Sequence, residues 1–127
     1  MLQNDFFTII SRSREGDVFR VSLEINATHP IFEGHFPGQP VVPGACLMQM
    51  VKEITETITG GNLQLNKAGQ IKFIAMIDPN ENNKLEMQLS IKTDEEGGTV
   101  VTANLLNNGS VCFRFDGLFQ LLKSAQI

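Results

Sequence analysis

The 127-residue chain has no tryptophan and no tyrosine, and it contains only two cysteines and two histidines. Cys46 and Cys112 stand in unlike contexts and do not make a disulfide framework, so a reducing, cytoplasmic location is expected. Cys46 is interpreted as a small buried apolar residue. No cluster of Cys and His has metal-ligand spacing, and His29 and His35 lie six residues apart in a proline-rich stretch. Neither a metal nor a cofactor is therefore predicted.

Long apolar runs and basic runs are also missing. No apolar stretch approaches the roughly 18 residues that a membrane span needs, and the first residues lack the basic-then-apolar order of a signal peptide. The net charge is −4, and lysine and arginine are scattered, which argues against nonspecific binding to nucleic acid or to an anionic membrane. The length and the 42% hydrophobic content are those of one globular domain over residues 1–127.

Alternation of apolar and polar side chains predicts that most of the chain is β-structure. Residues 18–25 alternate cleanly and predict a half-buried strand. After residue 62, turn residues separate further alternating segments, which predict four consecutive strands joined as hairpins. These segments are residues 71–77, 85–92, 101–105 and 111–121.

One segment has helical spacing instead. Apolar residues recur at intervals of three and four from Gly44 to about Thr59, with Pro43 at the start and Gly60 at the end. The apolar stripe of this helix is interpreted as core and comprises Leu47, Met50, Val51 and Ile54. The order strand, helix, four strands predicts one antiparallel sheet with one helix packed on it, an α+β domain.

Prolines are concentrated before this helix. Four of the five lie between Pro30 and Gly44, in a stretch that also contains several glycines. Proline fixes φ and glycine permits unusual φ, so this loop has few ways to move. His35 lies in its middle, and we interpret the rigidity as a means of holding that histidine in place.

The segment Gly34–Gly44 reads Gly-His-Phe-Pro-Gly-Gln-Pro-Val-Val-Pro-Gly. It resembles the active-site signature of the bacterial 3-hydroxyacyl-[acyl-carrier-protein] dehydratases, and the motif is long and specific. Those proteins have the hot-dog fold, in which an antiparallel sheet wraps a long central helix, and the predicted elements agree with that order over nearly the whole chain. The resemblance implies a homodimer or higher oligomer in which both chains form each active site.

The resemblance also implies roles for individual residues. His35 would remove the α-proton of a 3-hydroxyacyl thioester, with its ring oriented by the backbone carbonyl of Val41. The N–H groups of Gly44 and Ala45 would polarise the thioester carbonyl, a role that suits the unpaired amides at a helix start. The apolar tunnel for the acyl chain would be lined by Phe32 and Phe36.

The chain departs from the dehydratases at their helix carboxylate. Fourteen residues after His35, where those proteins read Glu-Ala-Met-Ala-Gln, this chain reads Gln49-Met-Val-Lys-Glu53. The carboxylate and the amide have changed places, one helical turn apart. Glutamine holds a hydroxyl but cannot act as an acid, and loss of a positioned acid typically costs about 10²- to 10⁴-fold in rate.

Three hypotheses follow from this exchange. Glu53 takes the carboxylate role from one turn deeper, or His35 alone moves the proton from carbon to the hydroxyl, or the chain binds acyl thioesters as the weaker half of a heterodimer. Plain structural interpretations compete with these. Glu53, beside Lys52 and Glu56, would belong to a solvated helix face, and His29 would be a solvated loop residue.

The function expected from these observations is (3R)-hydroxyacyl-[acyl-carrier-protein] dehydration in fatty-acid or related lipid or polyene synthesis. The alternatives are a noncatalytic acyl-thioester-binding or partner subunit, and an acyl thioesterase, against which the histidine loop counts. The substrate would be linked to acyl carrier protein or coenzyme A. Because a carrier protein is acidic, its binding needs a local basic patch. The candidates for that patch are Arg12, Arg14, Lys67, Lys72 and Arg114.

Overall fold

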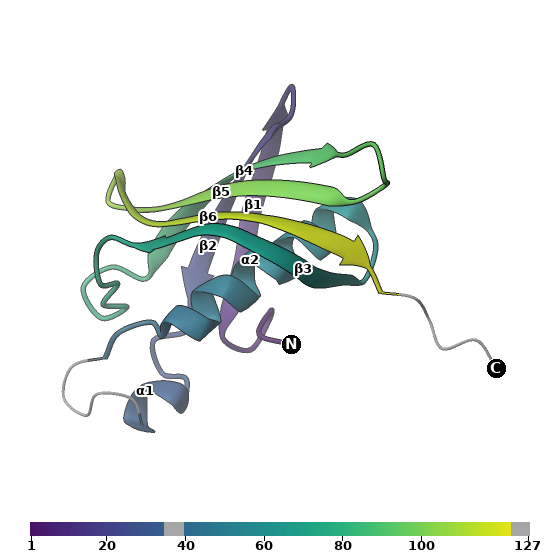
Figure 1. The fold of residues 1–127 in the computed structure, drawn as a ribbon. Coiled ribbons are helices and arrows are strands. Elements are labelled where there is room, and N and C mark those ends of the chain that lie inside the picture. Colours follow the sequence, from purple (N-terminus) through teal and green to yellow (C-terminus); the bar gives the residue numbers. More distant parts are fainter. Residues whose placement is uncertain (35–39, 123–127) are drawn as a thin grey trace.

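Six strands form one antiparallel sheet that curves around the helix α2 in the computed structural model, which describes residues 1–34 and 40–122 (Figure 1). The α+β class predicted from the sequence is confirmed. The helices are α1 (Ile31–Gly34) and α2 (Gly44–Thr59). The strands are β1 (Phe7–Glu15), β2 (Val18–Ile25), β3 (Leu63–Phe73), β4 (Lys84–Thr93), β5 (Thr99–Asn107) and β6 (Ser110–Leu121).

The strand order in the sheet is β1-β2-β4-β5-β6-β3. The predicted strands β2, β4, β5 and β6 are confirmed, but the prediction of four consecutive hairpins is wrong for β3. This strand pairs with β6, with Ile71 opposite Phe115, and it forms one edge of the sheet. β1, which the sequence analysis did not predict, forms the other edge, and it buries only Phe7 fully, so its residues show no clean alternation.

The predicted strand at residues 71–77 is also displaced. β3 begins earlier, at Leu63, and ends at Phe73. The apolar residues beyond it serve another contact, since the carbonyl of Ile77 accepts the N–H of Val42 at 3.0 Å. Residues 74–77 therefore lie against the segment that leads into α2.

α2 has the predicted bounds. Pro43 precedes it in an extended conformation, and Gly60, at φ 80°, ends it by donating its N–H to the carbonyl of Glu56. The apolar stripe of the helix is buried, as predicted, and faces the concave side of the sheet. Its buried apolar members are Cys46, Leu47, Met50, Val51 and Ile54.

The core lies between α2 and the inward side chains of the strands, and each large side chain buried there contributes about 1.5–3 kcal/mol. Phenylalanine fills much of the volume, as Phe6, Phe113 and Phe115 illustrate. Cys46 and Cys112 are buried and unpaired, and burial raises the pKa of both thiols. Within residues 1–34 and 40–122, no helix has the length and apolarity to cross a membrane.

The first seven residues fold back onto the helices (Figure 1). Asn4, at φ 68°, reverses the chain, and its N–H donates to the carbonyl of Phe7. Phe6 is fully buried and packs edge-on against His29 and beside Phe32 of α1. This N-terminal segment therefore joins α1 to the body of the domain.

Candidate functional site

The predicted base His35 and the predicted lining residue Phe36 lie outside the described residues. The structure describes the chain on both sides of them, up to Gly34 at the end of α1 and again from Pro40. The described part of the candidate site therefore consists of the segment that leads into α2, α2 itself and the strands around them.

The start of α2 presents backbone N–H groups without helical partners. Pro43 has no N–H, and among the described residues no side chain caps the helix. The first amide that bonds back is that of Cys46, which donates to the carbonyl of Pro43 at 3.0 Å, so the amides of Gly44 and Ala45 precede the hydrogen-bonded ladder. Their partial positive charge suits an oxygen on which negative charge develops.

An apolar pocket of about 360 Å³ opens at this helix start. It is lined by Val41, Val42, Pro43, Gly44 and Leu47, and by residues 73–77. The ring of Phe73 lies over Gly44, where a Cβ would stand only 2.8 Å from the ring Cε1, so a glycine permits this approach. Phe73 was predicted only as a strand residue, because nothing in the sequence shows that it meets the helix start.

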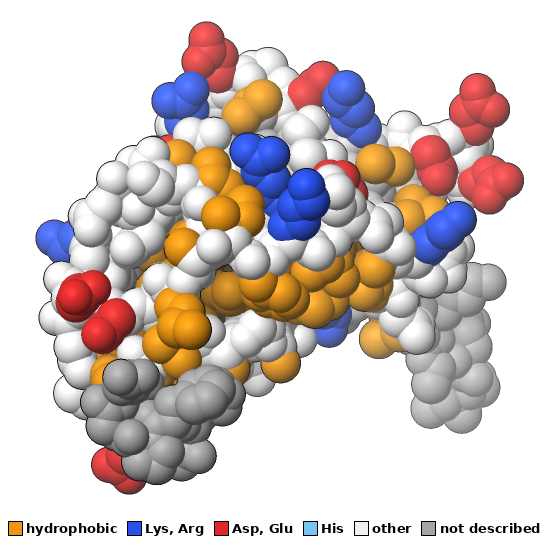
Figure 2. All heavy atoms as spheres, turned by 60° about the vertical axis from the view of Figure 1, so that its left-hand side comes forward, with side chains coloured by type: hydrophobic (Ala, Val, Ile, Leu, Met, Phe, Trp, Pro, Cys, Tyr) orange, Lys and Arg blue, Asp and Glu red, His pale blue; other side chains and the backbone are white. Residues whose placement is uncertain are grey.

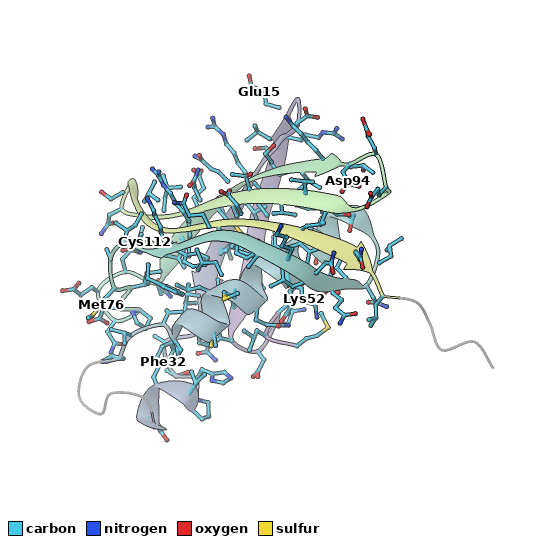
Figure 3. The ribbon with its side chains drawn as sticks, viewed as in Figure 1. Glu15, Phe32, Lys52, Met76, Asp94 and Cys112 are labelled. Carbon is cyan, nitrogen blue, oxygen red and sulfur yellow. The ribbon has the colours of Figure 1, made fainter. Side chains whose placement is uncertain are left out.

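The predicted substrate-binding residues do not all meet at this pocket. Val41 and Gly44 line it, and Ala45 is exposed beside them. Phe32 is only 7% exposed and packs on Phe6 in the core. Figure 3 shows Phe32 at the end of the molecule where α2 begins, the end that also carries Met76. The substrate-binding roles of these residues remain predictions.

Glu53 does not belong to a solvated helix face, and that interpretation is wrong. The residue is fully buried, and its carboxylate accepts the N–H groups of Leu2 and Gln3, each at 2.8 Å, and the Nε2 of Gln49 at 2.9 Å. Burial alone would raise the pKa of this carboxyl, but the three hydrogen bonds and the Met1 ammonium hold it below its usual range. Glu53 is therefore an anion at neutral pH.

Gln49 lies one turn before Glu53 on α2 and is partly exposed. Because an ionised carboxylate only accepts hydrogen bonds, the atom of Gln49 that meets Glu53 has to be the amide nitrogen. The structure thus brings together two of the three predicted catalytic residues, with the amide nearer the start of the helix and the carboxylate deeper.

His29 is partly buried, so the solvated-loop interpretation is wrong as well. Its side chain is 16% exposed, and its Nε2 lies 3.1 Å from a carboxylate oxygen of Asp5. The Nδ1 accepts the N–H of Ile31, the first residue of α1. His29 therefore ties the start of α1 to the N-terminal segment, a structural role.

A second pocket, of about 400 Å³, is lined by residues of β1, β2, β4 and β5 and of the β5–β6 turn, including Glu24, Lys84 and Glu86. None of the predicted site residues lines it. Within residues 1–34 and 40–122, no three His, Cys, Asp or Glu side chains gather where they could hold a metal ion.

Comparisons with known proteins identify the family of this chain. Residues 11–105 match the family model of the ApeI-like proteins, described as ApeI dehydratase. The chain belongs to the ApeI-like dehydratase family. The 3-hydroxyacyl-[acyl-carrier-protein] dehydratase FabZ of Haemophilus influenzae (strain PittEE) is 25% identical over 105 residues, covering 77% of this chain and 70% of that protein. The predicted resemblance is thereby confirmed, and so is the hydro-lyase class.

Solved structures with the same fold support the architecture. The dehydratase heterocomplex ApeI:P from Xenorhabdus doucetiae aligns with a TM-score of 0.68 at 20% identity, over 87% of this chain and 95% of that chain. The E. coli PaaI protein from the phenylacetic acid degradation operon aligns with a TM-score of 0.65 at 12% identity, over 92% and 80% of the two chains. The hot-dog fold predicted for this ApeI-like chain is confirmed.

Proposed function

We propose that this protein eliminates water from 3-hydroxyacyl thioesters on acyl carrier protein and produces trans-2-enoyl thioesters for fatty-acid or related lipid or polyene synthesis. The observation that carries the proposal is the uncapped start of α2, where Gly44 lies in an apolar pocket directly after the histidine loop. The pocket suits an acyl chain, and the first amides of the helix, which have no partner within it, suit the thioester oxygen. FabZ, which is similar over 77% of this chain, is a dehydratase of such substrates by its name.

The reaction needs a base, an electrophile for the thioester oxygen and a proton for the departing hydroxyl. His35 removes the α-proton, and the negative charge that develops on the thioester oxygen is stabilised by the amides of Gly44 and Ala45. As the carbon–carbon double bond forms, the C–O bond breaks and the imidazolium of His35 returns the proton to the hydroxyl, which leaves as water. Gln49 holds the hydroxyl by hydrogen bonding.

Glu53 does not supply this proton in the proposed mechanism. Its carboxylate is fully buried, ionised at neutral pH and engaged by three donors, two of them backbone N–H groups of the N-terminal segment. An acid has to be protonated and within reach of the leaving group. These contacts favour the hypothesis in which His35 alone moves the proton.

The test is the dehydration of a 3-hydroxyacyl-carrier protein by the purified protein, followed at the 2-enoyl product by mass spectrometry. We expect turnover that His35→Ala abolishes. The matched control is His29→Gln, which changes the other histidine and should keep most of the turnover, because His29 does not line the pocket. Unchanged turnover in His35→Ala would refute the proposed base.

A second candidate function is that of an acyl-binding partner subunit. It is favoured by Gln49 at the carboxylate position together with the sequestered Glu53. In that case the protein alone binds the acyl carrier without turnover, and activity appears only on mixing with a second hot-dog protein that keeps the carboxylate. A thioesterase is less well supported, because the carboxylate of Glu53 is fully buried and already engaged by three donors, away from the position where it could activate a water molecule on a substrate in the pocket.

For the acidic carrier protein we propose docking at Lys72 and Arg114. These residues are exposed cross-strand partners in β3 and β6, and Lys72 directly precedes the pocket residue Phe73. Figure 2 shows that Lys and Arg side chains gather above a band of apolar side chains on one face of the molecule. Arg12 and Arg14 are on β1, at the opposite sheet edge.

Charge reversal tests this docking surface. Lys72→Glu should lower kcat/KM for carrier-linked substrate more than for the coenzyme A thioester, because only the carrier protein brings acidic side chains to the surface. Arg14→Glu is the matched control at the other sheet edge and should affect neither substrate selectively. Equal losses of kcat/KM on both substrates would show that Lys72 does not contribute to docking of the carrier protein.

We also propose that the protein forms a homodimer, or a heterodimer of like geometry, through β3. This strand is at a sheet edge, its last residue Phe73 is exposed, and so are Ile74 and Met76 just beyond it. An exposed edge with apolar side chains favours pairing with another chain. Sedimentation equilibrium should give twice the 14.0 kDa chain mass or a higher multiple.

The buried, unpaired thiols support a reducing, cytoplasmic setting.

A further inference from the structure

The hydrogen bond between Gln49 and Glu53 determines how the Gln49 amide is oriented. The Nε2 of Gln49 lies 2.9 Å from the Oε2 of Glu53, across one turn of α2. Since the carboxylate cannot donate, an amide turned by 180° would place its oxygen against a negatively charged oxygen. The contact therefore excludes one of the two orientations that a free glutamine side chain would adopt.

Glu53 is a fixed acceptor. It is fully buried, and the N–H groups of Leu2 and Gln3, each at 2.8 Å, hold its two oxygens separately. Gln3 is itself tied to α2, because its Oε1 accepts a hydrogen bond from the hydroxyl of Thr57. A buried carboxylate held by three donors cannot rotate without leaving those donors unpaired. The fixed carboxylate of Glu53 therefore fixes the orientation of the Gln49 amide.

We propose that Glu53 is a positioning residue that turns the Oε1 of Gln49 toward the 3-hydroxyl of the substrate. This inference rests on the proposed dehydration. The hydroxyl donates its hydrogen to Oε1, which leaves the lone pairs of the hydroxyl oxygen open to the proton that His35 returns in the proposed mechanism. The hydroxyl keeps its own hydrogen, receives the second one from His35 and leaves as water, so the step needs no carboxylic acid.

The same geometry explains why restoring a carboxylate at position 49 alone should not create an acid. Gln49→Glu would place two carboxylates at the distance of the present hydrogen bond, and one of them would take up a proton held between the two. The double variant Gln49→Glu/Glu53→Gln keeps the contact with its direction reversed. The amide at position 53 then donates to the carboxylate at position 49, in the carboxylate-then-amide order of the dehydratases.

The experiment is a cycle of four proteins, namely wild type, Gln49→Glu, Glu53→Gln and the double variant. For each, kcat and KM are measured for dehydration of a 3-hydroxyacyl-carrier protein, and the side-chain amide signals are recorded by ¹⁵N NMR. The Gln49 amide signal is assigned by its loss in Gln49→Glu. Because one amide proton of Gln49 is bonded to Glu53, we expect its chemical shift to be displaced and its exchange with water to be slowed in the wild type. Glu53→Gln should remove both effects.

In the activity measurements, Glu53→Gln should lower kcat by about 10- to 100-fold with little change in KM, because the hydroxyl is misoriented while the acyl chain is still bound. The double variant should regain most of this loss, which is non-additive behaviour between contacting residues. Glu53→Asp, which keeps the charge, is measured beside it in case Glu53→Gln folds poorly, and it should retain more kcat.

The control is Thr55→Val. Thr55 is buried on the same helix and its hydroxyl donates to the carbonyl of Val51, so the variant perturbs the interior of α2 without removing a contact of Gln49. An equal loss of kcat in Thr55→Val at the same fall in Tm would reduce Glu53 to a structural role and overturn the proposal. Wild-type kcat in Glu53→Gln, or an unchanged amide signal, would overturn it while dehydration stands. Absence of turnover in the wild type would refute the dehydration itself, and the positioning role with it.

Discussion

Replacing Glu53 by glutamine is expected to lower the free energy of unfolding by about 2–4 kcal/mol at pH 7. The wild-type carboxylate accepts three hydrogen bonds in a fully buried position, and hydrogen bonds to charged groups contribute about 1.5–3 kcal/mol each. Glutamine has the same size and retains one oxygen, so part of the contacts survive. Its NH₂ group, however, replaces the second carboxylate oxygen and cannot accept a hydrogen bond. The donors that bonded to that oxygen in the wild type are therefore left unpaired.

The pH dependence of the difference between the two proteins identifies the carboxylate as its cause. The folded-state pKa of Glu53 lies below the ordinary value of 4.5. A depressed pKa means that the stabilisation is fully present above pH 4.5 and is lost as the pH falls through the folded-state pKa. The gap between wild type and Glu53→Gln should therefore be constant from pH 7 to about pH 5 and should narrow in more acidic solution.

Urea denaturation at several pH values measures this gap, provided that the slope of free energy against urea stays the same in both proteins. Glu15→Gln is the control, since Glu15 is exposed at the end of β1 and its replacement should change stability by less than about 0.5 kcal/mol. A gap below 1 kcal/mol at pH 7, or one that does not narrow on acidification, would refute the reasoning from the buried contacts.

Three glycine substitutions test the backbone and packing at other points. Gly44→Ala puts a Cβ 2.8 Å from the ring of Phe73 and should raise KM about 10-fold by displacing the ring into the pocket, an effect that Phe73→Ala should relieve. Gly117→Ala puts a Cβ 2.5 Å from the buried ring of Phe115 and should cost about 1–3 kcal/mol in urea denaturation. Gly60→Ala, at φ 80°, should cost about 1 kcal/mol by calorimetry, and an unchanged Tm would contradict the left-handed helix end.

Local patterns in the sequence were enough to predict the helix, four of the strands and the loop on which the site depends. The bounds of α2 follow from Pro43, Gly60 and the apolar spacing between them, all of which act within a few residues. The loop around His35 indicated the dehydratase family because its sequence from Gly34 to Gly44 resembles the signature of that family. Both kinds of signal are contained in neighbouring residues, and sequence analysis detects such signals directly.

Contacts between distant segments were decided only by the tertiary structure. β3 pairs with β6 instead of β4, which leaves β3 at the sheet edge and turns Phe73 toward Gly44. Glu53, beside charged neighbours on the helix, is buried because the backbone of Leu2 and Gln3, about fifty positions away in the chain, supplies its donors. The spacing of residues along a helix contains no information about such distant hydrogen-bond donors. A side chain's burial and protonation depend on whatever packs against it in space, and only the folded chain determines that.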